Sequence, residues 1–264
     1  MSQTQIRFED GDAYERSMGA WSLVAGTEFL DWLAPTPGLR WLDVGCGSGA
    51  FTELLIARHA PAEAHGIDPA PAQLAYARAR HAARAAHFQQ GDAMALPFPD
   101  DRFDAAAMAL VIHFVPDPAR GVAEMARVVR PGGIVAAYTW DMAGGGFPFA
   151  PVRGELAARG HATLAPPSAD ASDLGAMTAL WTAAGLRAVE TRAITVRRRF
   201  ADFEVFWETS TINGRIRPTL AALTAEERDR VKDGVRARLT VAADGSVTHM
   251  ARANAVRGQV PPAG

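Results

Sequence analysis

Apolar and polar positions follow two alternating patterns over residues 35 to 140. Short, nearly continuous apolar runs predict five strands, at 39–44, 64–67, 86–89, 103–110 and 134–140. Between them, apolar residues spaced three or four positions apart predict helices at 50–59, 71–84 and 118–130. This alternation predicts βαβ units and a mostly parallel sheet.

The chain after residue 140 is less regular and begins with the glycines at 144–146. The stretch 141–170 is predicted to cover the sheet rather than to join it. Two more strands are predicted, at 186–197 and 245–258, with helices at 172–184, 202–211 and 224–239. Thr224 and Glu227 have the spacing of a capping box, which predicts a helix beginning there.

Composition narrows the possible partners. The 27 basic and 29 acidic residues give a formal net charge of −2, which provides no overall field for nucleic acid. Cys46 is the single cysteine, so we expect neither a disulfide nor a multi-cysteine zinc site. No export signal and no apolar run of about 18 residues is present, so we expect no membrane span. A cytoplasmic protein with a small-molecule partner is predicted; the oligomeric state is not.

The stretch LDVGCGSGAF, residues 42–51, places three glycines between a predicted strand and a predicted helix. Glycines there allow a positive φ and a close approach of a ligand to the backbone. Gly45 to Ala50 fits the dinucleotide fingerprint G-x-G-x-x-G/A, which is a weak signal alone. No lysine follows Gly49, so the stretch is not a phosphate-binding P-loop of the Walker type.

Three carboxylates distinguish between the possible ligands. Asp43 stands two positions before the first glycine, where it disfavours a pyrophosphate and suits a cationic group. Asp68 ends the second predicted strand, where a carboxylate can accept hydrogen bonds from both ribose hydroxyls. Gly91, Asp92 and Ala93 follow the third strand and suit an adenine ring. The three positions together favour a nucleoside with a positively charged tail.

These motifs resemble class I S-adenosylmethionine-dependent methyltransferases, of the group that includes ubiquinone/menaquinone-biosynthesis-type enzymes. The resemblance rests on LDVGCGSG, GID at 66–68, GDAMALPFPDDRFD, VIHFVPDP at 111–118 and RVVRPGG at 127–133. YERSMGAWS, residues 14–22, is similar to an element that precedes the core in one subset of these enzymes. Ala20 departs from the arginine expected in that element.

The resemblance implies an α/β fold with a Rossmann-like, doubly wound sheet. Seven strands are expected in the order 3-2-1-4-5-7-6, with the last strand antiparallel and a helical cap. We expect one domain over residues 1–264. Its parts are an N-terminal helical lid (1–34), a cofactor-binding core (35–140), and cap segments with the last two strands (141–264).

The resemblance also implies S-adenosyl-L-methionine as cofactor and S-adenosyl-L-homocysteine as product. The methionine end would lie against Gly45, Cys46, Gly47, Ser48 and Gly49, with Asp43 near the ammonium. The nucleoside would be bound through Asp68, Pro69, Gln73, Gly91, Asp92 and Ala93. The carbonyl of Leu110 would face the ammonium, Ile112 and His113 would lie near the methyl group, and a lid would consist of Tyr14, Met18 and Trp21.

His113 is the one candidate general base, and the alternative is that it only shapes the pocket. The other histidines show no metal-ligand spacing along the chain, so no metal site is predicted. Cys46 lies at a helix N-terminus, where a thiolate would be stabilised, but no motif supplies it with a base. Phe203, Phe206 and Trp207 are expected either in the core or beside the acceptor.

The predicted reaction is in-line methyl transfer to an oxygen, nitrogen or carbon nucleophile, promoted by positioning and desolvation. Three alternatives stay open: an NAD-dependent oxidoreductase, a nucleic-acid methyltransferase, and a non-catalytic binder of S-adenosyl compounds. Asp43 and Asp92 argue against the first, and neutral charge argues against the second. Absence of turnover despite tight cofactor binding would favour the third.

Overall fold

The computed structural model describes residues 15–80 and 85–262. A seven-stranded sheet in the order β3-β2-β1-β4-β5-β7-β6 forms its centre. The strands are β1 (Arg40–Val44), β2 (Glu63–Asp68), β3 (Ala86–Gln90), β4 (Phe103–Ala109), β5 (Val129–Trp140), β6 (Arg187–Phe200) and β7 (Val247–Gln259). The first five strands are parallel, whereas β7 runs antiparallel to both β5 and β6. The predicted order and strand directions are therefore confirmed.

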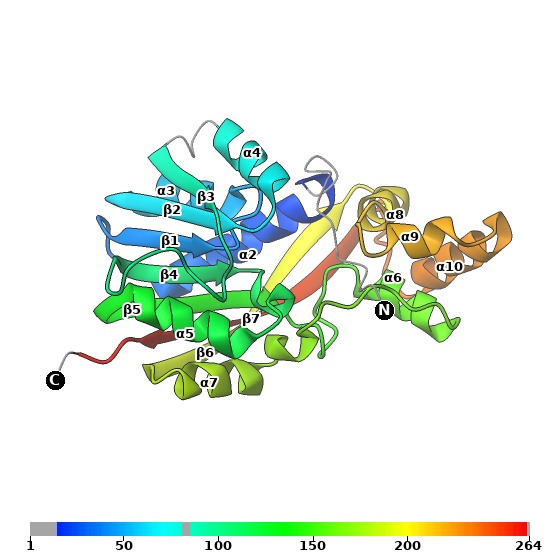
Figure 1. Ribbon diagram of the computed structural model, residues 1–264. Coiled ribbons are helices and arrows are strands. Elements are labelled where there is room, and N and C mark those ends of the chain that lie inside the picture. The colour runs from blue at the N-terminus through cyan, green and yellow to red at the C-terminus, as the bar shows by residue number, and fades with distance from the viewer. Residues whose placement is uncertain (1–14, 81–84, 263–264) are drawn as a thin grey trace.

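Helices cover both faces of this sheet (Figure 1). The π-helix Glu15–Gly19, α2 (Ala20–Leu33) and α3 (Ala50–His59) lie on one side, and α5 (Pro118–Val128) and α7 (Leu174–Ala183) on the other. α4 (Pro71–Ala79) packs beside β2 and β3. Successive residues of β4 alternate between the two cores, with Ala105 and Ala107 in one and Ala106 and Met108 in the other. Burial on both sides explains the continuous apolar run of this strand.

A helical cap stands at one end of the sheet (Figure 1). It consists of α6 (Ala150–Ala158), α8 (Phe203–Thr211), α9 (Arg217–Ala221) and α10 (Ala225–Ala237), and the long strands β6 and β7 reach it. The capping box of Thr224 and Glu227 is present at the start of α10. α6 and α9 were not predicted, because α6 has a glycine in its middle and α9 has only five residues.

The predicted helix at 50–59 has those bounds, whereas several other boundaries differ. α5 ends at Val128, and β5 begins at Val129 rather than at Ile134. The Pro-Gly-Gly sequence thus lies inside β5, where the pairing with β4 shifts register between Phe103 and Ala105. In addition, α4 ends at Ala79, before the predicted end at residue 84. Within 15–80 and 85–262, no helix is long and apolar enough to cross a bilayer.

One carboxylate ties three strands together at the end opposite the glycine loop. Asp104, in β4, accepts hydrogen bonds from the Arg40 backbone amide at 2.7 Å and its Nε at 3.1 Å, in β1. It also accepts one from Nε of Arg130, in β5, at 2.6 Å. The hydrogen bonds from Arg40 hold the pKa of Asp104 well below its ordinary value. The charged form of Asp104 is therefore favoured by folding.

We predict that Asp104→Asn lowers the free energy of unfolding by about 1–3 kcal/mol in urea titrations, because charged hydrogen bonds are lost. The folded-state pKa is depressed, so this contribution is present above the unfolded pKa of about 4 and disappears as pH falls below it. Asp229→Asn, an exposed substitution in α10, is the control. Equal stability of the Asp104→Asn variant and the wild type at neutral pH would contradict the assignment.

Candidate active site

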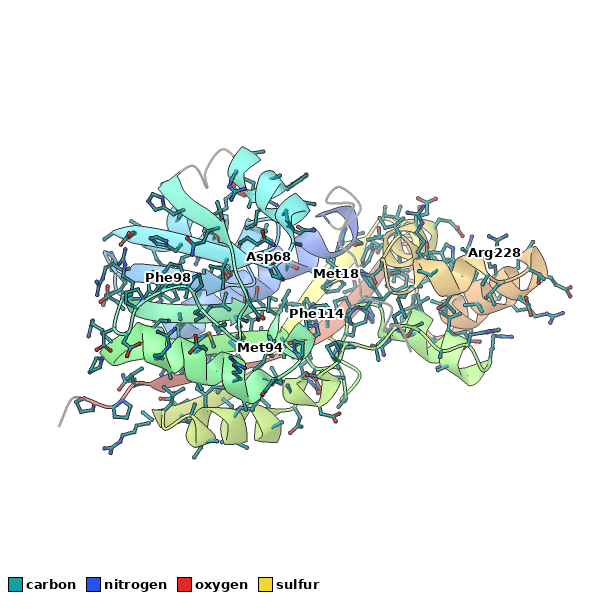
Figure 2. All side chains as sticks on the ribbon, in the orientation of Figure 1. Met18, Asp68, Met94, Phe98, Phe114 and Arg228 are labelled. Carbon is teal, nitrogen blue, oxygen red and sulfur yellow. The ribbon has the colours of Figure 1, made fainter. Side chains whose placement is uncertain are left out.

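A cavity of about 1600 Å³ opens at the carboxyl ends of the parallel strands. It lies where the strand order reverses between β1 and β4, which is the usual ligand position in such sheets. Asp68 from the end of β2, Phe114 from the turn after β4 and Met18 from the N-terminal helical segment all line it (Figure 2). The cap contributes Asn213 and Arg215 to its wall.

The structure brings most of the predicted site residues to this cavity. Its lining includes Met18, Asp43, Gly45, Cys46, Gly47, Ser48, Asp68, Pro69, Gln73, Gly91, Asp92, Ala93, Leu110 and His113. Gly49 and Trp21 are not part of the lining. Tyr14 falls outside the described residues.

Four backbone amides of the glycine loop are already bonded within the protein. Gly45 and Cys46 both donate to the Ile67 carbonyl at 2.8 Å, and Gly49 donates to the Cys46 carbonyl at 2.8 Å. Gly47 donates to Oδ2 of Asp68 at 3.0 Å. These four amides are therefore committed to the protein, which disfavours a pyrophosphate bound by an amide nest at this turn.

Gly45 must be a glycine for steric reasons. Its φ is +75°, and a Cβ there would lie 2.5 Å from Cγ1 of Val111. Gly47 and Gly49 also have positive φ values, of +51° and +78°. The alternating glycines let the chain turn tightly from β1 into α3 while its backbone faces the cavity.

Asp43 lies near the end of β1, just before this turn, and is almost fully buried, with 1% of its surface exposed. Its Oδ2 accepts a hydrogen bond from the Thr52 hydroxyl at 2.6 Å. Its Oδ1 has no hydrogen-bond partner in the part of the chain that the structure describes. Burial raises the pKa of Asp43 to about 7, against the effect of the Thr52 hydroxyl. A buried carboxylate oxygen without a partner, in a cavity wall, fits a cationic group of a ligand.

Asp68 braces the loop as well as lining the cavity. Oδ1 accepts from the Ala70 amide at 2.8 Å, while Oδ2 holds Gly47. Burial raises the pKa of this carboxyl group. Each carboxylate oxygen can accept two hydrogen bonds, so both retain capacity for a ligand hydroxyl.

Comparison with known proteins agrees with this geometry. Residues 42–137 match a family described as "Methyltransferase domain". A rice chloroplast protein named 2-methyl-6-phytyl-1,4-hydroquinone methyltransferase 2 is 42% identical over 96 residues, which is 36% of this chain and 28% of that protein. The malonyl-[acyl-carrier protein] O-methyltransferase of Serratia marcescens is 34% identical over 129 residues, 47% of this chain and 49% of that protein.

The fold has solved counterparts. Phosphoethanolamine N-methyltransferase 2 of Haemonchus contortus, solved with S-adenosylhomocysteine, aligns with a TM-score of 0.57 and 19% identity, over 94% of this chain and 56% of that one. Residues 42–137 therefore match a methyltransferase domain, and the fold is shared with solved methyltransferases. Such domains use S-adenosylmethionine, so the oxidoreductase alternative is set aside. The match spans less than half the length of each curated relative named above.

At the end of the cavity formed by the loop after β3, Asp92 closes a turn. Its Oδ1 accepts from the Met94 amide at 2.8 Å. Across the cavity, Leu110 has a left-handed φ of 62°, unusual for a branched side chain, and its amide donates to the Tyr138 carbonyl at 2.8 Å. This turn redirects the backbone at the end of β4, beside the cavity.

Cys46 differs from the expectation of a stabilised thiolate. Burial raises the pKa of its thiol far above the ordinary range, and the carboxylates of Asp43 and Asp68 add to the effect. The nearby negative charges and the lack of water outweigh the helix N-terminus. Cys46 is therefore a protonated, packed side chain of the loop.

His113 lies in the cavity wall at 3% exposure. Its Nδ1 is 2.5 Å from the Thr139 hydroxyl, and its ring centroid is 4.2 Å from that of Phe114. Burial lowers the pKa of His113 well below its ordinary value, and the Arg215 cation lowers it further. The imidazole is consequently neutral at pH 7, with Nδ1 used by Thr139.

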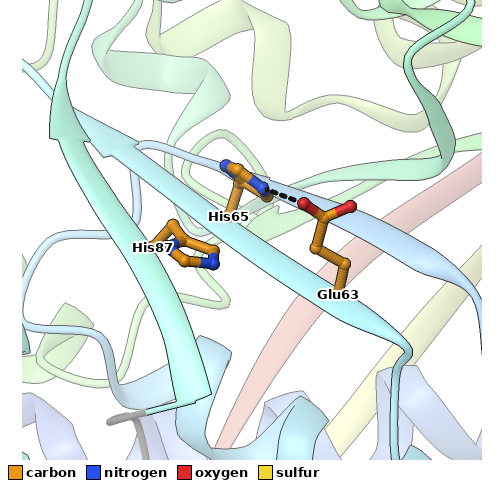
Figure 3. Close-up of side chains that lie close together, drawn as sticks. All are labelled: Glu63, His65 and His87. Atoms are coloured by element: carbon orange, nitrogen blue, oxygen red, sulfur yellow. Dashed lines mark hydrogen bonds and ion pairs between the residues drawn. The ribbon is translucent and has the colours of Figure 1, made fainter.

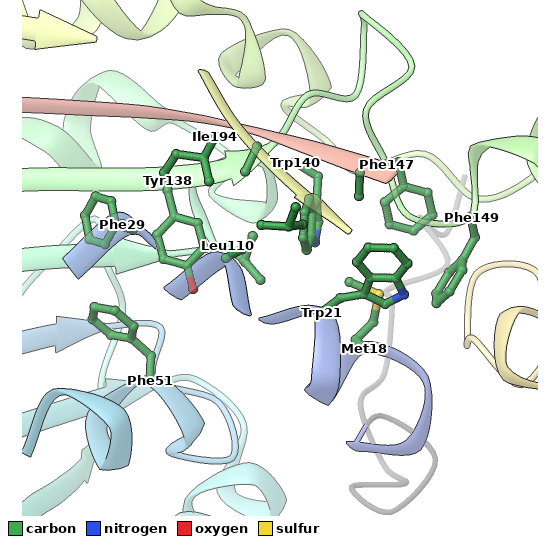
Figure 4. Packing of buried hydrophobic residues seen from close by; sticks show 14 of the residues in the cluster. Met18, Trp21, Phe29, Phe51, Leu110, Tyr138, Trp140, Phe147, Phe149 and Ile194 are labelled. Atoms are coloured by element: carbon green, nitrogen blue, oxygen red, sulfur yellow. The ribbon is translucent and has the colours of Figure 1, made fainter. Parts of the chain in front are cut away.

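Trp21 belongs to the core beside the cavity rather than to its wall (Figure 4). Its ring centroid lies 6.5 Å from that of Trp140, 6.2 Å from Phe200 and 5.9 Å from His249. The expected cofactor contact of Trp21 therefore has no support in its position, whereas Met18 does line the cavity. Met18 and Trp21 are close in the sequence. Packing of Trp21 against β6 and β7 keeps it out of the cavity wall, whereas Met18 faces the cavity.

Several lining residues were not predicted from the sequence. Among them are Phe114, Tyr138, Trp140, Phe147, Asn213 and Arg215. Arg215 is 6% exposed, and its guanidinium lies 4.3 Å above the Phe114 ring. It sits in an irregular loop, where no periodicity marks it. Phe203 and Phe206 pack in the core and, with Trp207, stay out of the lining.

Away from the cavity, three side chains on β2 and β3 gather unexpectedly. Ligand atoms of Glu63, His65 and His87 all lie within 4.8 Å of one another (Figure 3). The spacing of these histidines along the chain gives no indication of this grouping, which the tertiary structure creates. Residues 63 and 65 share a strand face, and only the pairing with β3 adds residue 87.

We predict that Asp68→Ala weakens S-adenosylhomocysteine binding at least about tenfold by calorimetry, because charge-assisted hydrogen bonds of about 1.5–3 kcal/mol each are lost. Asp68→Asn, which keeps an oxygen for the backbone, should fall between that variant and the wild type. Asp233→Ala, exposed in α10, is the control. Unchanged affinity in a folded Asp68→Ala variant would refute the ribose assignment.

We also predict a pH dependence that comes from Asp43. With a pKa of about 7, its ionised fraction rises with pH, and an ammonium group binds the ionised form. The dissociation constant for S-adenosylhomocysteine should therefore fall by about tenfold between about pH 6 and pH 8. The Asp43→Asn variant should bind more weakly and lose this pH dependence. A slope that survives in that variant would exclude Asp43 as its origin.

Proposed function

We propose that the protein transfers a methyl group from S-adenosylmethionine to a small-molecule acceptor that carries an anionic group. The single observation behind the proposal is the composition of one continuous cavity. Asp43, Asp68 and Asp92 come from the ends of the strands, where the lining pair Glu53 and Arg80 form an ion pair at 2.7 Å, and Arg215 comes from the cap. Opposite charges on the two sides favour two different ligands in one space.

The volume of the cavity is large enough for a cofactor and an acceptor together. Pockets for a single small ligand measure about 300–1000 Å³, and this cavity measures about 1600 Å³. The named relatives act on a hydroquinone and on a malonyl group carried by a protein. For this chain we propose a small molecule rather than a nucleic acid, because its net charge of −2 gives no general attraction to nucleic acid.

The strand ends would hold the cofactor, which supplies an electrophilic methyl group when bound. In this proposal Asp43 pairs with the ammonium, Asp68 accepts from the ribose hydroxyls, and Asp92 with the Ala93 amide binds the adenine. Pro69 and Gln73 flank the nucleoside, and the Leu110 carbonyl faces the ammonium.

The cap and the turn after β4 would position the acceptor. Arg215 pairs with the anionic group, and the aromatic side chains of Phe114, Trp140 and Phe147 exclude water. His113 is neutral and keeps one ring nitrogen, Nε2, beyond its contact with Thr139. It accepts the acceptor's proton where the nucleophile is not yet ionised, and otherwise shapes the pocket. Positioning and desolvation provide most of the rate enhancement.

A screen of small carboxylates, phenols and their neutral analogues, with formation of S-adenosylhomocysteine as readout, tests the reaction. RNA and a protein extract are included as competing acceptor classes. Turnover on anionic small molecules is expected. Methylation restricted to RNA would overturn the proposed acceptor class. If no acceptor of any class is methylated, the non-catalytic binder is favoured.

We predict that Arg215→Gln raises the acceptor KM by at least about tenfold, since one charged hydrogen bond of about 1.5–3 kcal/mol is lost. Cofactor affinity should stay within about twofold, because Arg215 lies on the cap side. Arg215→Lys should restore part of the loss. Arg217→Gln, exposed two positions further on, serves as the control. An unchanged KM would exclude a direct contact between Arg215 and the acceptor.

A further inference from the structure

The cluster on β2 and β3 follows from strand geometry. β2 and β3 pair in parallel with His65 opposite His87, so the two imidazoles project from the same sheet face. Glu63 precedes His65 by two positions and shares that face. The two histidine rings are 5.0 Å apart between centroids, and His65 Nε2 lies 2.9 Å from Oε1 of Glu63 (Figure 3).

This set of donors suits a divalent transition metal ion. Two imidazoles and one carboxylate make up a common zinc ligand set, with remaining positions filled by water. His87 is exposed, which leaves such positions open to solvent. The ligand atoms lie within 4.8 Å of one another, so rotations of the side chains would bring them to bonding distance, about 2.0–2.2 Å, from one ion.

The carboxylate is ready to act as a ligand. Arg102 donates to Oε1 of Glu63 at 2.5 Å, the same oxygen that contacts His65. Both contacts fall on one oxygen, so the other, Oε2, takes no part in them. Nδ1 of His65 is buried and has no hydrogen-bond partner among residues 15–80 and 85–262.

The Arg102 cation is the competitor of any metal ion at this position. Its guanidinium also lies 5.2 Å from the centre of the Phe103 ring. Like charges repel, so a bound metal ion would displace the guanidinium from Glu63 or bind less tightly beside it. This competition separates a metal site from an ordinary ion-pair network, because the two respond oppositely to loss of the arginine.

We propose that Glu63, His65 and His87 form a binding site for a divalent transition metal ion, with Zn²⁺ as the best match. The site joins the edge strand β3 to β2. Since β3 leads directly to Gly91, the metal would fasten the strand that precedes the adenine end of the cavity. A metal that binds only the folded chain stabilises it by mass action.

Calorimetric titration of the full-length, tag-free protein with Zn²⁺ tests the proposal, with Co²⁺ absorption as a second readout. One Zn²⁺ per chain is expected. His87→Ala and Glu63→Gln should each weaken binding at least about tenfold, since loss of even an outer-shell partner typically costs about 10–100-fold. His161→Ala is the matched control and should bind like the wild type. Circular dichroism establishes that each variant is folded.

Arg102→Gln is the decisive variant. It should tighten Zn²⁺ binding, because Glu63 is then released from its competing cation, whereas a purely structural network would show no gain. Absence of stoichiometric Zn²⁺ binding in the wild type, or unchanged binding by His87→Ala, would overturn the site. These readouts do not depend on methyl transfer, so the outcome stands apart from that of the proposed function.

Discussion

The hydrogen bonds from the glycine loop to β2 organise the whole site. The amides of Gly45 and Cys46 share the Ile67 carbonyl, and the Gly47 amide binds the Asp68 carboxylate. These bonds hold the loop in left-handed conformations that only glycine adopts easily. Because the amides are satisfied internally, the loop presents carboxylates rather than an anion-binding nest to the cavity. The orientation of these amides therefore disfavours a nucleotide phosphate at this turn.

Asp43 is the clearest consequence of that arrangement. The loop seals it from water, and Thr52 satisfies only one of its oxygens. A buried carboxylate in that state is costly in the free protein, and a cationic ligand group offsets the cost. Leu110, with its left-handed backbone on the opposite side, shows a second local cost at the same edge.

Much of the core was predictable from the sequence. The five parallel strands, and α3 with its bounds, follow from the spacing of apolar residues and from the glycines and prolines that mark the ends of the elements. Asp68 and Asp92 line the cavity because a motif that ends a parallel strand lies at the carboxyl edge of the sheet. Boundaries failed where tertiary pairing overrode local signals, as at Pro131, which lies within β5 at a shift of register.

Local pattern determined which segments become strands and helices, and which residues stand at strand ends. Only the tertiary structure decided which side chains face the core, the cavity or one another. It turned Trp21 into the core, brought Arg215 from an irregular loop to the cavity, and kept Cys46 protonated between carboxylates. It also set His65 beside His87. The reason is physical: periodicity reports the buried face of one element, whereas charge, protonation and shared cavities depend on contacts between elements distant in sequence.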